Sequence, residues 1–168
     1  PFDNIVAIGR VNRLHLGKRN KAQRGELFAH PPRGFVKSVS GQLTLDSDEQ
    51  VQSTIRLCFE KFSTLGSGRA LLRWLLGNDI RLPSRVRCGP HKGELRWAPA
   101  GHGAVYELLH HPFYAGAYCY GRTITEPTRQ GSGRRCTVSL EDWQVLRKDH
   151  LPAYISWDQY LSNLKQLA

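Results

Sequence analysis

The sequence predicts an α+β protein that is mainly helical, with helix-turn-helix-like helices and a small β-hairpin or sheet. Three observations predict this fold class. Apolar residues recur at helical spacing in several segments, and one short stretch near the start has the pattern of two strands joined by a turn. The third is size, because 168 residues, 40% of them hydrophobic, suffice for one domain with at most a small appendage.

The first part of the chain contains a weak helical pattern, a basic segment and a hairpin. Residues 5–16 place apolar side chains close to helical spacing, which predicts a short helix. From Gly17 to Gly34 the chain is polar and cationic and ends in two prolines, an arginine and a glycine, so we expect an extended or turning loop. Residues 34–37 and 42–45 flank a polar turn and predict a short hairpin.

The clearest helix follows this hairpin. We expect Asp46 or Ser47 to cap it, with Glu49 or Gln50 completing a capping box three residues on. Its apolar side chains form one stripe, which indicates a core helix. The stripe consists of Val51, Ile55, Cys58, Phe59 and Phe62.

Two further helices are expected next. Ser67 is suited to cap the second and Gly77 to end it. The third runs from about Gly101 to His110, because Pro112 ends it. Its outward residues are expected to be His102, Tyr106 and His110, and its inward residues Ala104, Val105, Leu108 and Leu109. Two short helices separated by a cationic stretch give a helix-turn-helix arrangement with a long turn, although helices that only pack together show the same pattern.

The positive charge is concentrated in three segments. The formal net charge is +10, but residues 10–37, 81–97 and 122–135 together carry +14 and the rest of the chain −4. Such segregation favours a polyanionic partner, and the alternative is a solvated basic face without one. No apolar run is long enough to span a bilayer, and no basic segment forms a membrane-binding amphipathic helix. We therefore expect double-stranded DNA and no membrane as partner, and a cytoplasmic, nucleoid-associated location.

The cysteines and histidines give little support for a metal. No two of the four cysteines form a Cys-x-x-Cys pair, so reduced thiols are expected. Cys88 and His91 have a ligand-like spacing, with Cys119 and Cys136 as further candidates, but structural zinc sites normally use two tight pairs. We expect no metal and no cofactor.

An enzyme is the first alternative to a DNA-binding module. A metal-dependent nuclease would use His102, His110 and His111 with an acid such as Glu107. The sequence offers no acidic cluster for a two-metal site, which counts against this alternative. RNA binding is disfavoured because no exposed aromatic sheet motif is present.

Short blocks in a fixed order carry a more specific signal. The central block is His111 followed by Pro112-Phe113-Tyr114-Ala115-Gly116, with Gly121-Arg122 shortly after. The later block consists of Trp143, His150, Pro152, Ile155, Ser156, Trp157 and Tyr160, with Ser156 and Gln159 suited to cap a final helix. Over about residues 14–168 the order resembles the recombinase domain of the large serine recombinases, which include phage serine integrases and transposon recombinases. The central block is similar to that family's Asn-Pro-x-Tyr-x-Gly block, with His111 where Asn is usual.

The resemblance implies a role in DNA recombination. In that family an N-terminal catalytic domain carries the serine that attacks DNA phosphate, and a long helix links it to the recombinase domain. This sequence has no Tyr-x-x-Arg-x-Ser nucleophile motif, so we assign no catalytic residue. The expected function is sequence-specific DNA binding as the targeting domain of a site-specific serine recombinase, with strand cleavage by the absent catalytic domain. A stand-alone helix-turn-helix regulator or a decayed recombinase is the alternative.

The resemblance also implies a division of the chain. Residues 1–16 correspond to the end of the linking helix, 17–34 to a basic DNA-contacting linker and 35–168 to the DNA-binding domain. The intact family works through dimers and a tetramer on DNA, and this chain alone is expected to be a monomer.

The candidate DNA contacts combine the resemblance with the positions of charge. The linker is expected to supply phosphate or minor-groove contacts and the third helix, with flanking arginines, to read bases. For each residue the alternative is a solvated or packing role. The linker residues are Lys18, Arg19, Lys21, Arg24 and Arg33, and the base-reading candidates are Arg96, His102, Tyr106 and Arg122.

Overall fold

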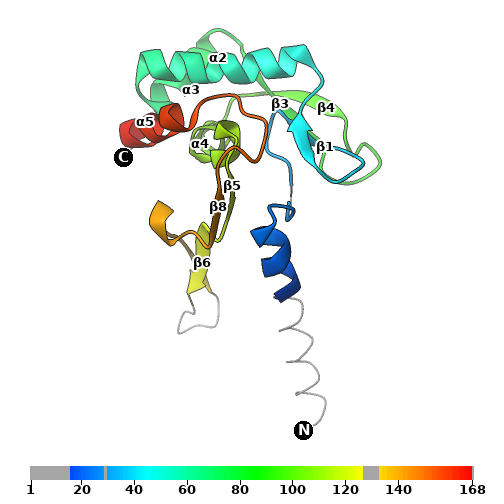
Figure 1. Ribbon diagram of the computed structural model, residues 1–168. Helices are drawn as coiled ribbons and strands as arrows, with labels where there is room; N and C mark the ends of the chain where they lie inside the picture. Colours follow the sequence, from blue (N-terminus) through cyan, green and yellow to red (C-terminus); the bar gives the residue numbers. More distant parts are fainter. Residues whose placement is uncertain (1–15, 29, 127–132, 168) are drawn as a thin grey trace. The chain divides into compact units, whose positions relative to one another are not determined.

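The computed structural model describes residues 16–28, 30–126 and 133–167. The chain divides into two compact units. The helical unit comprises His30–Ala117 and Lys148–Ala168, and the strand unit comprises Pro1–Ala29 and Tyr118–Arg147. Helices and short antiparallel strand pairs confirm the α+β class (Figure 1). The helix expected over residues 5–16 lies outside the described residues except at Leu16.

Four α-helices form the helical unit around one core. They are α2 (Glu49–Leu65), α3 (Gly68–Gly77), α4 (His102–His110) and α5 (Trp157–Leu167), with a 3-10 turn η1 (Pro112–Ala115) after α4. All five residues of the predicted α2 stripe are buried, and Val105, Leu108 and Leu109 of α4 are buried as predicted. Ser67 caps α3 and Ser156 accepts a hydrogen bond from the backbone of Gln159 at the start of α5, as expected.

The caps of α2 and α3 differ in part from the expectation. Asp48, rather than Asp46 or Ser47, caps α2, because its carboxylate accepts hydrogen bonds from the next helical N–H groups. The side chain of Asp46 is engaged elsewhere, with Arg85. Gly77 is the last residue of α3 rather than its cap, and Asp79 takes the left-handed backbone conformation there (φ 49°).

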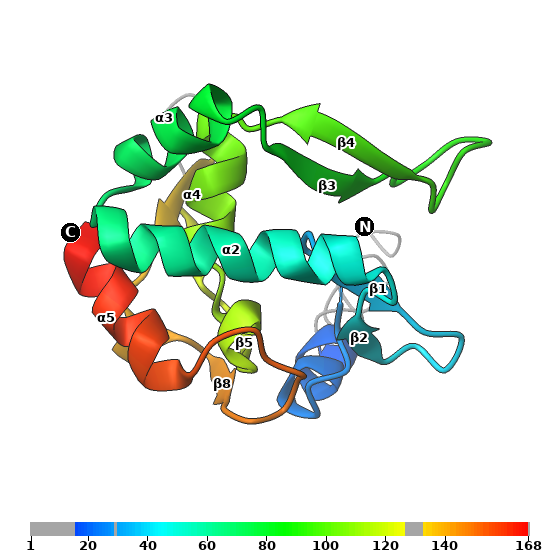
Figure 2. The ribbon, with the colours of Figure 1, turned by 90° about the horizontal axis from the view of Figure 1, so that it is seen from above.

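Two hairpins complete the helical unit. The predicted one forms from β1 (Phe35–Lys37) and β2 (Leu43–Leu45). The second, β3 (Arg81–Arg85) with β4 (Leu95–Pro99), occupies the cationic stretch between α3 and α4 that was expected to be the long turn of a helix-turn-helix arrangement. Figure 2 shows this hairpin extending away from the helices.

The described residues of the strand unit include two strand pairs and a helical segment. Strand β5 (Tyr118–Tyr120) pairs with β8 (Val145–Arg147), and β6 (Thr123–Glu126) pairs with β7 (Arg134–Thr137); η2 (Leu140–Asp142) lies between β7 and β8. Residues 16–23 are helical, so the loop expected from residue 17 onward was wrong for this part. Ala, Lys, Arg and Gln all favour a helix, and the side chain of Ala22 is fully buried, which anchors it.

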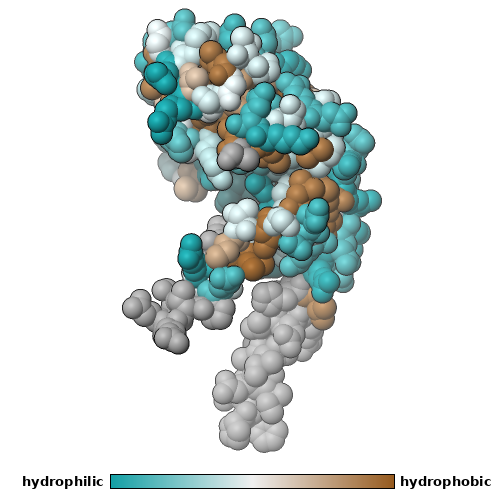
Figure 3. Space-filling model, turned by 90° about the vertical axis from the view of Figure 1, so that its left-hand side faces the viewer, coloured by the Kyte–Doolittle hydropathy of each residue, from teal (hydrophilic) through white to brown (hydrophobic). Residues whose placement is uncertain are grey.

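One face of the molecule is mainly polar. On the face seen in Figure 3, hydrophilic residues cover much of the surface and hydrophobic ones lie between them. Within the described ranges, no helix has the length and apolar character needed to cross a membrane.

Candidate nucleic-acid interface

The helical segment 16–23 of the strand unit gathers predicted DNA contacts. Lys18, Arg19 and Lys21 are all exposed, and no ion pair among the described residues involves them. Arg24, just after the helix, pairs with Glu26 at 3.0 Å, where both side chains are more than half exposed. An exposed pair of this kind is weak in water. The structure therefore places these four cations together on a helix and the turn that follows it, rather than on an extended strand.

This basic helix is fixed to the strand unit by its backbone. The Arg147 guanidinium donates a hydrogen bond to the carbonyl of Gln23 at 3.2 Å. The Tyr118 hydroxyl donates to the carbonyl of Leu27 at 3.1 Å, and the Tyr118 ring meets that of Phe28 edge to face. These contacts use backbone oxygens and aromatic rings, so the cationic side chains stay available for a ligand.

Arg122, in the same unit, has packing contacts. Its guanidinium lies over the Trp143 ring, 5.5 Å from the ring centroid. Gly121 before it has φ 82°, and a Cβ there would lie 2.7 Å from Cγ of Gln144. Burial raises the pKa of the Cys119 thiol to about 11, although the neighbouring Arg122 charge acts in the opposite direction. Arg122 thus has a structural role, and its DNA contact stays a prediction.

Arg33 connects the start of the helical unit to α4. Its Nη1 donates to Glu107 Oε2 at 2.7 Å, and its carbonyl accepts a hydrogen bond from the Tyr114 hydroxyl at 2.9 Å. Glu107 is the only acidic residue of α4, so this pair neutralises the single negative charge on that helix. Arg33 therefore neutralises the carboxylate of α4, and its own contact with DNA stays a prediction.

The outward face of α4 is formed as predicted. His102, in the first turn, is exposed, and Tyr106, one turn later, is 56% exposed. The Tyr106 ring stacks on His110 with the centroids 3.8 Å apart, and the His110 Nδ1 atom lies 2.9 Å from the Tyr106 carbonyl oxygen. That distance favours the tautomer with a proton on Nδ1, because a carbonyl only accepts. Arg96 is on β4, also exposed, with Glu94 3.6 Å away.

The residues considered for a metal do not converge. No group of three His, Cys, Asp or Glu side chains within the described residues is arranged to hold a metal ion. His111 Nδ1 accepts a hydrogen bond from the Phe113 backbone, His110 stacks on Tyr106, and Glu107 pairs with Arg33. The four cysteines are free thiols.

Comparison with known proteins identifies the family. The sequence model of the family described as Recombinase matches residues 49–168, a range that contains all of α2 to α5. The chain belongs to this family. A Sinorhizobium fredii (strain NBRC 101917 / NGR234) protein named "Uncharacterized protein y4bA/y4pH" is 42% identical over 152 residues, which are 90% of this chain and 22% of that protein. The recombinase-family chain therefore spans about a fifth of that relative's length.

A solved structure has a similar fold. A chain from the "Crystal Structure of a LSR-DNA Complex" matches with a TM-score of 0.59 and 14% identity, over 92% of this chain and 38% of that one. Together with the family match, this confirms the resemblance to the recombinase domain of the large serine recombinases.

The block that carries the recombinase resemblance is structural. Pro112, Phe113, Tyr114 and Ala115 are buried in η1, and Tyr114 is 1% exposed. Gly116 has φ 70°, and its carbonyl accepts the backbone N–H groups of His150 and Leu151. The block thus joins α4 to the segment before α5, and it explains the fold rather than the ligand.

The β3–β4 hairpin of this recombinase-family chain was not expected from the sequence. The β3–β4 hairpin exposes Arg87 and Lys92 at its tip. Pro83, in the middle of β3, obscures the strand pattern because proline cannot donate a backbone hydrogen bond and within sheets is confined to edge strands, first strand residues and bulges. The signal that could have revealed the hairpin is the pair of glycines, Gly89 and Gly93, which both adopt positive φ in the turn.

Proposed function

We propose that this chain binds double-stranded DNA as the targeting domain of a site-specific serine recombinase. Strand cleavage is assigned to a catalytic domain of the parent protein, since this sequence has no serine-nucleophile motif. The parent is expected to act in dimers and tetramers on DNA within the nucleoid. Family membership and the similar fold in a DNA complex support the proposal.

The observation that carries the proposal is the cationic helix 16–23. Lys18, Arg19 and Lys21 lie within four residues, all exposed, and no ion pair in the described part of the chain involves them. Like charges held this close repel one another, and an array of phosphates relieves that repulsion while its condensed counterions are released. The cluster therefore suits a nucleic-acid backbone better than a single carboxylate.

The α4 face is proposed to read bases. His102 and Tyr106 stand one turn apart on a helix whose only carboxylate is neutralised by Arg33. A helix of this kind fits the major groove, where side chains reach base edges. Arg96 and Arg122 are proposed as further contacts.

A salt titration tests the proposal. Binding of the 168-residue chain to a short fluorescent DNA duplex is measured by anisotropy at increasing salt, with an unlabelled RNA hairpin as competitor. We expect the logarithm of the binding constant to fall steeply and linearly with the logarithm of the salt concentration, by about 0.9 per phosphate contacted. A slope near zero, or displacement by the RNA at lower concentration than by DNA, would overturn the proposal.

A further inference from the structure

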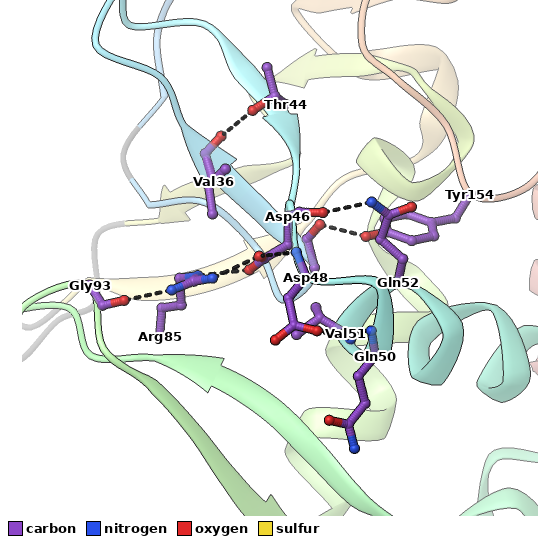
Figure 4. Close-up of polar contacts among 11 residues, drawn as sticks. Val36, Thr44, Asp46, Asp48, Gln50, Val51, Gln52, Arg85, Gly93 and Tyr154 are labelled. Carbon is purple, nitrogen blue, oxygen red and sulfur yellow. Dashed lines mark hydrogen bonds and ion pairs between the residues drawn. The ribbon is translucent and has the colours of Figure 1, made fainter.

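One partly buried ion pair holds the turn end of the β3–β4 ladder (Figure 4). Arg85 Nε and Nη2 donate to the two carboxylate oxygens of Asp46, each at 2.7 Å, and Arg85 Nη1 donates to the Gly93 carbonyl, also at 2.7 Å. The Asp46 side chain is 3% exposed and that of Arg85 33%. One guanidinium thus connects the end of β3 and the turn residue Gly93 to the residue where β2 leads into α2.

Asp46 is itself fixed by contacts from three directions. Its backbone N–H donates to the Gly34 carbonyl at 2.9 Å, and its carbonyl accepts from Gln52 Nε2 at 2.7 Å. Its Oδ1 atom also accepts from the Asp48 N–H at 3.1 Å. The hydrogen bonds from Arg85 hold the pKa of Asp46 below its usual value, so the carboxylate stays ionised at neutral pH. The anchor is therefore rigid and charged.

Directly beyond this ion pair, residues 86–94 form an ordered, cationic turn. Backbone hydrogen bonds between Val86 and Glu94, and between Lys92 and Gly89, close it. Arg87 and Lys92 are exposed, and the ion pairs within the described ranges do not include either of them. The turn's carboxylate, Glu94, already faces His91 at 2.8 Å and Arg96 at 3.6 Å.

The two arginines at this end of the ladder, Arg85 and Arg96, lie on opposite faces of the hairpin. Arg85 pairs with Leu95 across the ladder, so the next residue, Arg96, points to the opposite face of the hairpin. One arginine therefore faces the anchor and another faces away from it. Two-stranded antiparallel ribbons also have a width that DNA grooves accept.

We infer that the β3–β4 hairpin is a second DNA-contacting element, in which Arg87 and Lys92 bind backbone phosphates and Asp46 and Arg85 are positioning residues. The inference rests on the proposed function. Phosphates are the expected targets because the tip holds two exposed cations that form no ion pair among the described residues, and a phosphate contact needs charge but no base-specific geometry. The tip adds affinity and orientation, and sequence preference arises elsewhere.

The first test removes the tip charges. In the full chain, the double variant Arg87→Ala/Lys92→Ala is compared with Arg73→Ala/Lys165→Ala, which removes two exposed cations from α3 and α5. We expect the tip variant to reduce the magnitude of the salt slope by about 2, equally on different duplex sequences, and the control to change it little. Equal effects of both variants would overturn the inference, because net charge alone would then explain the loss.

The second test separates position from charge. Asp46→Asn adds a unit of positive charge to the chain, so electrostatics alone predicts tighter DNA binding. A positioning role predicts weaker binding, by several-fold, because Arg85 no longer holds the hairpin. Arg85→Lys keeps the charge but cannot make the forked contact, and it should show the same loss. Circular dichroism at each salt concentration establishes that the variants are folded.

The outcomes distinguish this inference from the proposed function. A wild-type chain that does not bind duplex DNA overturns both. If the wild-type chain has a steep salt slope and the tip variant has the same slope, only the DNA-contacting role of the hairpin is overturned. If Asp46→Asn fails to fold, Arg85→Lys decides the positioning role: unchanged affinity and salt slope for that variant contradict it.

Discussion

The basic helix 16–23 gives the most direct quantitative prediction. The perturbation is the triple substitution Lys18→Ala/Arg19→Ala/Lys21→Ala, which should preserve the helix because alanine has the highest helix propensity. Each phosphate contact contributes about 0.9 to the salt slope, so three contacts contribute about 2.7. When the salt concentration rises from about 50 to about 200 mM, the DNA affinity of the wild type should fall about 40-fold more than that of the variant.

The assay is fluorescence anisotropy on the same duplex at several salt concentrations. The matched control is Asn20→Ala/Gln23→Ala, which changes two exposed neutral side chains of the same helix. The control should leave the slope unchanged, because the contact between Arg147 and this helix uses the Gln23 backbone carbonyl. A triple variant with the wild-type slope, or a control with the same decrease, would refute the assignment of these cations to phosphates.

Four further predictions concern stability and specificity. Asp46→Ala should lower the free energy of unfolding in urea by about 3–5 kcal/mol, whereas Glu26→Ala in an exposed pair should change it by less than about 1 kcal/mol. The folded-state pKa of Asp46 lies below the usual 3.8, so the ionised carboxylate stabilises the fold above that pH. The difference in free energy of unfolding between the wild type and Asp46→Asn should therefore be greatest above pH 3.8 and vanish in acid. A difference that does not change with pH contradicts this. Tyr106→Ala should reduce binding to a preferred sequence more than to random DNA, and equal losses in selection experiments would exclude base reading. Gly116→Ala should destabilise more than Gly66→Ala in thermal melts, because both have positive φ but only at Gly116 would a Cβ meet a carbonyl oxygen, at 2.8 Å; equal melting temperatures would count against the clash.

Elements whose signals are local could be predicted from the sequence. The α2 stripe follows from spacing within one helix, and Ser67 caps α3 through a side chain three residues from its target. The outward positions of His102 and Tyr106 follow from the same periodicity. In each case the residues that decide the structure lie within a few positions of one another.

Elements that depend on distant partners could not be predicted in this way. Asp46 is of a residue type that often caps helices, but its carboxylate pairs with Arg85, 39 positions away. Asp48 caps α2 instead. The segment 16–23 has the charge and the nearby glycines, Gly17 and Gly25, that are typical of a loop. Burial of Ala22 nevertheless stabilises it as a helix. Sequence patterns carry little information about such long-range contacts, which explains why the hairpin anchor was missed.

Two groups of arginines and lysines among the described residues differ in their partners. Arg33 and Arg85 form short ion pairs with carboxylates far away in the sequence, Glu107 and Asp46, and both are at least partly buried. Substituting them should change stability and the orientation of neighbouring elements. The exposed cations of the basic helix and the hairpin tip lack such partners among the described residues, so their substitution should change the salt slope with little effect on stability. Among the described residues the positive charge therefore includes at least these two kinds, and the exposed cations of the basic helix and the hairpin tip are the ones we propose to meet backbone phosphates.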